Sequence, residues 1–255
     1  MADPLLRVEK LVRRFGGILA TDHLSLDVIS GDLHAIIGPN GAGKTTLISQ
    51  LTGQLLPNSG TVHFAGQDIT RLPAWRRSAL GLARSFQITS LLPDFTASDN
   101  VALAAQAHDG HSFRFWGRAR GEQHLRQAAQ SALARVGLDD RADTLVSKLS
   151  HGEQRELELA VALATKPQLL LLDEPMAGLG TTESARMVKL LQELRREVTI
   201  VLVEHDMEAV FALADRITVL VYGRVIASDV PAAIRGNEEV RRAYLGDQHV
   251  VTRHG

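Results

Sequence analysis

The chain contains no cysteine in its 255 residues, which excludes a disulfide framework and fits a reducing compartment. No apolar run approaches the roughly 18 to 20 residues that span a bilayer. The most apolar stretches, Leu169 to Leu172 and Thr199 to Val203, have the length of strands. The first residues also lack the basic start and apolar core of a secretory signal. We therefore expect a cytoplasmic protein unless another molecule holds it to a membrane.

An excess of charge of either sign is also missing. Lysine and arginine number 28 against 29 acidic residues, for a net charge of -1, so the chain has no global electrostatic footprint for DNA or RNA. We expect no nucleic-acid partner. Apolar residues make up 45% and charged residues 22%, which is the balance of a globular protein. The length suits one large domain or a domain that carries a subdomain.

The order of the expected elements indicates an α/β fold. Strands are expected over residues 5–11, 23–28 and 33–37, and a glycine-rich loop and a helix over 44–51 follow the third strand. Strand, glycine loop and helix in this order form half of a parallel α/β unit. The same rhythm resumes after residue 168, with strands over 169–172 and 199–203, helices over 182–196 and 207–214, and a hairpin of strands 216–221 and 224–227 turning at Tyr222-Gly223.

The segment from Pro73 to Ser147 has a different character. Helical periodicity dominates it, over residues 97–108 and 122–136, and strand-like runs vanish. We interpret the segment as a mostly helical subdomain inserted into the α/β core. The last residues, 247–255, are polar, and we expect them to form a flexible tail.

The loop from Gly38 to Thr45 reads Gly-Pro-Asn-Gly-Ala-Gly-Lys-Thr and matches the phosphate-binding pattern G-x-x-x-x-G-K-[ST]. Glycines let successive backbone N–H groups surround phosphates, and the start of the following helix adds partial positive charge. Lys44 is expected to reach the β- and γ-phosphates, and the Thr45 hydroxyl to ligate Mg²⁺. The alternative is a glycine turn beside a surface lysine. We assign nucleotide binding to Asn40, Gly41, Gly43, Lys44, Thr45 and Thr46.

A second motif is the apolar run from Leu169 to Leu172, which ends in Asp173 and Glu174. A buried parallel strand has its carboxyl end at the ligand crevice, where Asp173 can hold Mg²⁺ through water. Glu174 can orient or deprotonate the attacking water. The alternative is a core strand capped by two solvated acids, which the pairing with the phosphate loop disfavours.

With these motifs in place, the sequence resembles the nucleotide-binding subunits of ABC transporters over residues 5–246. The most specific marker is Leu149-Ser150-His151-Gly152-Glu153-Gln154, which is similar to the LSGGQ signature of that family. The resemblance implies an α/β P-loop NTPase core with a mixed, largely parallel sheet, an antiparallel β subdomain and an inserted α-helical subdomain. It implies one domain over 5–246, with the core over about 5–86 and 150–246 and the helical subdomain over about 87–149.

The resemblance also implies roles for single residues. Ser150 and Gly152 match the positions that bind the γ-phosphate of ATP held by the other subunit, while His151 and Glu153 depart from the signature. The start of this helix is equally explained by Ser150 and Glu153 as a capping box, and both roles are compatible. Gln87 corresponds to the glutamine that contacts Mg²⁺ and water.

Two further positions follow from the same resemblance. His205 corresponds to the histidine that contacts the γ-phosphate. Phe15 corresponds to the aromatic ring that stacks on adenine, although a structural role for this phenylalanine stays open. Glycine in Ala177-Gly178-Leu179-Gly180 replaces an aspartate through which the family's subunits communicate.

The C-terminal third resembles the branched-chain amino acid importer group, in phrases such as Val203-Glu204-His205-Asp206-Met207 and Val240-Arg241-Arg242-Ala243-Tyr244-Leu245-Gly246. The resemblance implies an ATPase that uses ATP and Mg²⁺ on the inner face of the cell membrane. Its implied partners are a second nucleotide-binding subunit, identical or paralogous, permease subunits, and indirectly a solute-binding protein. An exporter-type subunit, such as one for lipopolysaccharide, is the alternative. A soluble ATPase acting on nucleic acid or ribosomes and a nucleotide sensor without turnover are less favoured.

The segment Gly110 to Gly121 mixes aromatic residues with Arg114, Arg118 and Arg120. Such a composition suits an interface with a membrane subunit or with anionic lipid. A loop with its aromatic rings folded onto the domain is an equal alternative.

Overall fold

The computed structural model describes residues 3–84, 91–108 and 118–248. The strands are β1 (Leu6–Phe15), β2 (Ile18–Val28), β3 (Leu33–Ile37), β4 (Ser59–Phe64), β5 (Gln67–Asp68), β6 (Leu82–Arg84), β7 (Leu169–Asp173), β8 (Thr199–Val203), β9 (Arg216–Val221) and β10 (Arg224–Asp229). The helices are α1 (Lys44–Leu51), α2 (Ala74–Ala79), α3 (Ala97–His108), α4 (Arg118–Val136), α5 (His151–Ala164), α6 (Thr181–Leu194), α7 (Met207–Leu213), α8 (Pro231–Gly236) and α9 (Glu238–Gln248). Short 3₁₀ turns occupy Asp139–Arg141 and Val146–Lys148.

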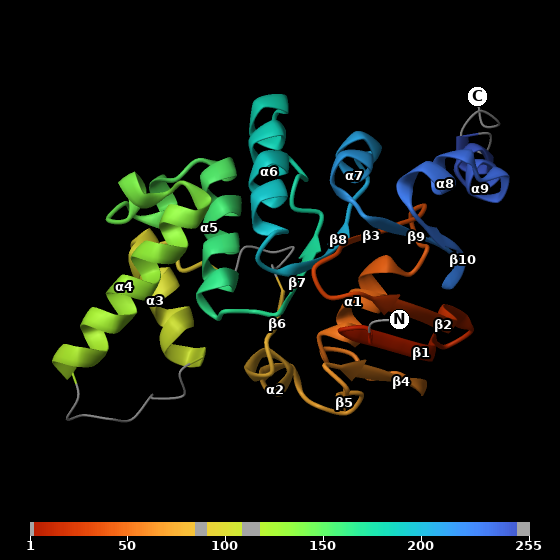
Figure 1. Ribbon diagram of the computed structural model, residues 1–255, viewed down its shortest axis with the longest axis horizontal. Helices are drawn as coiled ribbons and strands as arrows, with labels where there is room; N and C mark the ends of the chain where they lie inside the picture. The colour runs from red at the N-terminus through yellow and green to blue at the C-terminus, as the bar shows by residue number, and fades with distance from the viewer. Residues whose placement is uncertain (1–2, 85–90, 109–117, 249–255) are drawn as a thin grey trace.

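The strands form a six-stranded sheet in the order β10-β9-β3-β8-β7-β6 and a four-stranded sheet in the order β2-β1-β4-β5 (Figure 1). Strand β3 pairs in parallel with β8 and β9, and β7 pairs in parallel with β8 and β6. Every residue of β3, β7 and β8 is buried, as expected where a parallel sheet is covered on both faces. The expected strands over 33–37, 169–172 and 199–203 are thus confirmed.

The smaller sheet is antiparallel and has one buried face. In β2, buried and exposed side chains alternate from Leu24 to Val28, because successive side chains of a strand point to opposite faces. The buried set packs in one cluster with Leu47 and Ile48 of α1 and with Val201 of the larger sheet. Helix α1 therefore has apolar partners from both sheets, and it lies beside β1 and β2 in Figure 1.

Helices α3, α4 and α5 gather at one end of the molecule (Figure 1). Val101 of α3, Leu133 of α4 and Leu157 of α5 are buried in one cluster. The helix expected over 97–108 is confirmed. The division of the chain into a core and an inserted helical subdomain stays an interpretation of the sequence.

One expectation is wrong. Strand β6 lies within the segment from Pro73 to Ser147, in which no strand was expected. With three residues it is too short to show a period, and it forms because Leu82 to Arg84 pair with Leu169 to Leu171 of β7. Helix α9 runs to Gln248, and the flexible tail expected over 247–255 stays a prediction.

The hairpin of β9 and β10 is confirmed, with Tyr222 and Gly223 at its turn and positive φ angles of 47° and 77°. Helices α8 and α9 follow the hairpin, and Ile234 and Val240 pack in a cluster with Val219. Within the described residues, no helix combines the length and apolar character needed to cross a membrane.

Candidate active site

The glycine-rich loop joins the end of β3 to the start of α1. Gly43 precedes the helix with a φ of 102°, and a Cβ at this position would lie 2.2 Å from the carbonyl oxygen of Ala20. Only glycine therefore allows the loop to approach β2 this closely. The side chain of Thr45 is exposed at the first turn of α1, where unpaired backbone N–H groups favour an anion. Of the other expected ligands, Asn40 and Gly41 are exposed and Thr46 is half-buried.

Lys44 is buried under the same loop. Its ammonium group donates hydrogen bonds to the carbonyl oxygens of Gly38 at 2.6 Å and Pro39 at 3.0 Å. Burial lowers the pKa of Lys44, and the carboxylates of Glu174 and Asp173 oppose that shift. The ammonium group thus lies between the loop carbonyl oxygens and the acidic end of β7. Phosphate oxygens can replace these carbonyl oxygens as its partners.

Asp173 is the last residue of β7 and only 3% exposed. Its Oδ2 accepts a hydrogen bond from the guanidinium of Arg84 at 3.0 Å, while its Oδ1 is buried without a partner. Burial raises the pKa of Asp173, and Arg84 opposes the shift. A buried carboxylate oxygen without a partner is a ligand type that suits Mg²⁺, as is the hydroxyl of Thr45. Within the described residues, no group of three acidic, histidine or cysteine side chains converges on a metal-binding position.

Glu174 and His205 meet at the carboxyl ends of β7 and β8. Glu174 has a φ of 53°, and its backbone N–H donates to the carbonyl oxygen of Val203 at 2.9 Å. Its Oε1 lies 2.8 Å from Nε2 of His205. Both side chains are partly exposed, at 25% and 46%. The contact gives a partly solvated carboxylate whose orientation is fixed by an imidazole, which suits a group that aligns or deprotonates water.

The start of α5 is capped as expected. The Ser150 hydroxyl accepts from the N–H of Glu153 at 3.2 Å, and the Glu153 carboxylate accepts from the N–H of Ser150 at 2.8 Å. At Gly152 a Cβ would lie 2.7 Å from Oε1 of Glu183, so this glycine also lets α5 approach α6. Helix α5 lies among the helices at one end of the molecule, whereas α1 lies beside the antiparallel sheet (Figure 1).

Phe15 is 46% exposed at the end of β1, and the Arg13 guanidinium carbon lies 4.7 Å from its ring centroid. Its ring face is already in contact with a cation, which is compatible with stacking on a planar base from the other side. Gln87 lies outside the described residues, as does most of the segment Gly110 to Gly121.

Sequence reasoning assigned no role to Glu204 and Arg84, both of which contact the site. Glu204 follows the apolar run of β8 directly, as Asp173 closes that of β7, and this shared pattern was the available signal. Arg84 has no comparable signal, because its contact with Asp173 spans 89 positions.

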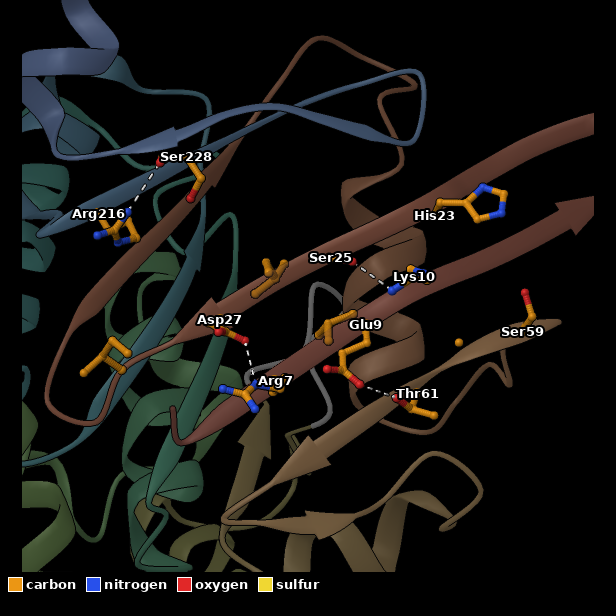
Figure 2. Close-up of a pocket in the computed structure, with 14 residues that line it drawn as sticks. Arg7, Glu9, Lys10, His23, Ser25, Asp27, Ser59, Thr61, Arg216 and Ser228 are labelled. Carbon is orange, nitrogen blue, oxygen red and sulfur yellow. Dashed lines mark hydrogen bonds and ion pairs between the residues drawn. The ribbon is translucent and has the colours of Figure 1, made fainter. Parts of the chain in front are cut away.

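A separate open groove of about 1160 Å³ is lined mainly by residues of β1, β2 and β4, with Arg216 of β9 and Ser228 of β10 at its edge. Figure 2 shows Arg7 directed to Asp27 and Thr61 directed to Glu9 between neighbouring strands. No expected site residue lines this groove.

Comparisons with known proteins agree with this geometry. A family model described as ABC transporter matches residues 21–177, and one described as branched-chain amino acid ATP-binding cassette transporter matches residues 224–250. The chain is 38% identical over 255 residues to the high-affinity branched-chain amino acid transport ATP-binding protein LivG of Escherichia coli, covering 97% of this chain and 100% of LivG. It is 37% identical to BraF of Pseudomonas aeruginosa, with the same coverage.

Solved structures lead to the same family. A nucleotide-free ATP-binding cassette from an ABC transporter superposes with a TM-score of 0.84 at 29% identity, over 94% of this chain and 98% of that one. The ADP conformation of the cassette MJ1267 gives the same score and identity, over 96% and 100% of the two chains. The chain belongs to the ABC transporter family, as an ATP-binding cassette that hydrolyses ATP on an α/β P-loop fold.

Proposed function

We propose that this chain energises the import of branched-chain amino acids or related small solutes. The observation that carries the proposal is its likeness to LivG over the full length of LivG, at 38% identity. The match of residues 224–250 to the branched-chain amino acid cassette model supports the same substrate class from the C-terminal segment.

In the proposed reaction, Lys44 exchanges its bonds to the loop carbonyls for bonds to the β- and γ-phosphates of ATP. The hydroxyl of Thr45, the free oxygen of Asp173 and the side chain of Gln87 would hold Mg²⁺. When bound, Mg²⁺ neutralises phosphate charge and favours departure of ADP. Glu174 aligns water with the γ-phosphorus, and His205 holds Glu174 and faces the charge that develops on the phosphate. The contact of 2.8 Å between the two side chains supports this pairing.

A second nucleotide-binding subunit completes the proposed site. Ser150 and Gly152 lie at the start of α5, and a helix start with unpaired N–H groups binds anions. Because α5 and α1 lie apart in Figure 1, we propose that two subunits close head to tail around two ATP molecules. Each ATP then contacts the loop of one subunit and the α5 start of the other.

A membrane permease is the second proposed partner, and it would hold the chain on the inner face of the cell membrane. A pocket of about 310 Å³ lies where α2 and β6 meet α3 and α5. Trp75, Leu91 and Val161 line it together with Arg84 and Gln54, and Trp75 is 67% exposed. An exposed aromatic beside an arginine is typical of protein interfaces, so we propose that side chains of a permease subunit enter this pocket.

Uptake in the native cell tests the proposal. The gene is deleted, and initial uptake of labelled leucine and of labelled ribose is measured after complementation with wild type or with Glu174→Gln. Leucine uptake restored only by wild type, with ribose uptake unchanged throughout, supports the proposal. Leucine uptake that does not respond to the deletion contradicts it. Loss of lipopolysaccharide export instead would favour the exporter alternative.

A further inference from the structure

Glu204 is a buried carboxylate at the end of β8 that joins two loops of the site. It is 4% exposed. Its Oε1 accepts a hydrogen bond from the backbone N–H of Met176 at 2.9 Å, and its Oε2 accepts one from the N–H of His205 at 2.9 Å. A third, longer contact runs from the N–H of Asp206 to the same Oε2 at 3.5 Å. One side chain thus binds the loop after β7 and the loop after β8.

The loops after β7 and β8 are joined first by backbone pairing and then by side-chain contacts. Strands β7 and β8 pair up to Asp173 and Val203, and the N–H of Glu174 continues the pairing by donating to the carbonyl of Val203. Beyond that point the backbone pairing stops. One further link is the bond from the N–H of Met176 to Glu204, and another is the contact between the side chains of Glu174 and His205. The bond from the N–H of His205 to Glu204 lies within the loop after β8 and fixes the Glu204 carboxylate against that backbone.

We infer that Glu204 is a positioning residue for ATP hydrolysis, which sets the separation and orientation of Glu174 and His205. The inference rests on the roles proposed above for those two residues. Glu174 adopts a left-handed φ of 53°, a conformation that is uncommon in a non-glycine residue and costs energy that neighbouring contacts must offset. Glu204 stabilises this conformation by accepting a hydrogen bond from the backbone of Met176, two residues after Glu174. It holds the backbone of His205 at the same time.

The two bonds require a carboxylate. Each oxygen of Glu204 accepts from a different loop, so both positions must be acceptors. Glutamine has the same size and shape but offers one oxygen and one NH₂ group. In Glu204→Gln, one of the two backbone N–H groups therefore faces a donor and is left unsatisfied in a buried place, which is costly. That loop moves away, and the geometry of Glu174 and His205 is lost.

The test compares Glu204→Gln with a matched control, Asp215→Asn. Asp215 also accepts a backbone N–H from a neighbouring segment, that of Leu33 at 2.9 Å, and pairs with Arg195. It lies at the opposite end of the parallel strands, where β3 begins. The purified variants are measured for kcat and KM of ATP hydrolysis, for binding of a fluorescent ADP analogue, and for melting temperature.

For Glu204→Gln we expect kcat to fall about 10- to 100-fold, as for a misplacement of catalytic groups by about 1 Å. The affinity for the ADP analogue stays within about twofold of wild type, because Lys44 and the phosphate loop are untouched. Asp215→Asn lowers the melting temperature and keeps kcat. If Glu204→Gln does not fold, Glu204→Asp replaces it, since the shorter side chain reaches only one loop and the same loss of kcat is expected.

A kcat of the Glu204 variant within about twofold of wild type would overturn the inference, as would an equal loss in Asp215→Asn. Glu174→Gln and His205→Ala are measured in parallel. If these two keep their kcat, the proposed catalytic roles fail. If they lose it while Glu204→Gln does not, only the positioning role fails. Adding Glu204→Gln to Glu174→Gln should cost little more than Glu174→Gln alone, because residues that act as one unit are not additive.

Discussion

Replacement of Arg77 by methionine tests how the C-terminal end of helix α1 is held. Arg77 is 1% exposed, and its guanidinium has no carboxylate partner within hydrogen-bond distance in the described structure. It donates instead to four carbonyl oxygens. Two belong to Gln50 and Leu51 at the end of α1, at 2.7 Å each, and two to Leu72 and Thr70, at 2.9 and 3.0 Å. Burial lowers the pKa of Arg77 to about 10, which keeps it charged at neutral pH.

The expected loss of stability follows from these four bonds. Each buried acceptor left without its donor costs about 1 kcal/mol or more. The carbonyl of Gln50 keeps a hydrogen bond from the N–H of Gly53 at 3.3 Å, so the other three losses sum to about 3 kcal/mol or more. Removal of a desolvated charge returns part of this cost. We therefore expect Arg77→Met to lower the free energy of unfolding by about 3 kcal/mol, or the melting temperature by about 6 to 12 °C. The charge also faces the negative end of the α1 dipole, so its loss loosens the helix that carries Lys44.

The assay is chemical denaturation in guanidinium chloride, with Arg76→Met as the matched control. Arg76 precedes Arg77 in the same helix, is exposed, and contacts the ring of Trp75 at 5.1 Å, so its loss should cost little. A shift in Arg77→Met no larger than that in Arg76→Met would refute the reasoning.

Three further predictions concern the site and the core. Lys44→Ala should weaken ADP binding about 10- to 100-fold, since a charge-assisted bond is worth about 1.5–3 kcal/mol. Calorimetric titration measures this, and unchanged affinity would remove Lys44 from the phosphate site. Glu174→Gln should bind ATP but lower kcat about 10²- to 10⁴-fold, and light scattering with ATP should detect a trapped dimer. Substantial turnover by this variant would contradict the catalytic role of Glu174. Burial, aided by the charge of Arg216, lowers the pKa of His34 from 6.5 to about 4. The unfolded chain therefore takes up this proton first, so the contribution of neutral His34 to stability is present above pH 6.5 and falls by up to about 3 kcal/mol toward pH 4. His34→Gln should reduce this pH dependence in denaturation curves, and an unchanged slope would show that another group causes it.

The parallel core and the phosphate loop could be predicted because their signals are local. The apolar runs of β3, β7 and β8 are short and continuous, as strands buried on both faces must be, and Gly43 marks a loop that approaches β2. The antiparallel hairpin of β9 and β10 could be predicted from its turn at Tyr222-Gly223.

Other features depend on contacts between residues distant in the sequence, and no local sequence pattern predicts them. Strand β6 exists because it pairs with β7, 87 positions away at Leu82 and Leu169. The four carbonyls that Arg77 binds come from two separate turns of the chain. In Ala74–Ala79 the arginines at 76 and 77 look alike in the sequence, yet one is exposed and the other is buried, and only packing decides which.

Glu204 combines a local sequence signal with a contact between distant residues. A parallel strand covered on both faces disfavours charged side chains along its length, so its first carboxylate comes at the carboxyl end, where the sheet opens to the ligand. In β7 that residue is Asp173, and after β8 it is Glu204. The burial that selects the strand thus also places carboxylates at the site. Asp173 keeps a free oxygen there, whereas both oxygens of Glu204 are taken by backbone N–H groups. The same sequence pattern therefore yields one carboxylate that can bind a ligand and one that can only position its neighbours.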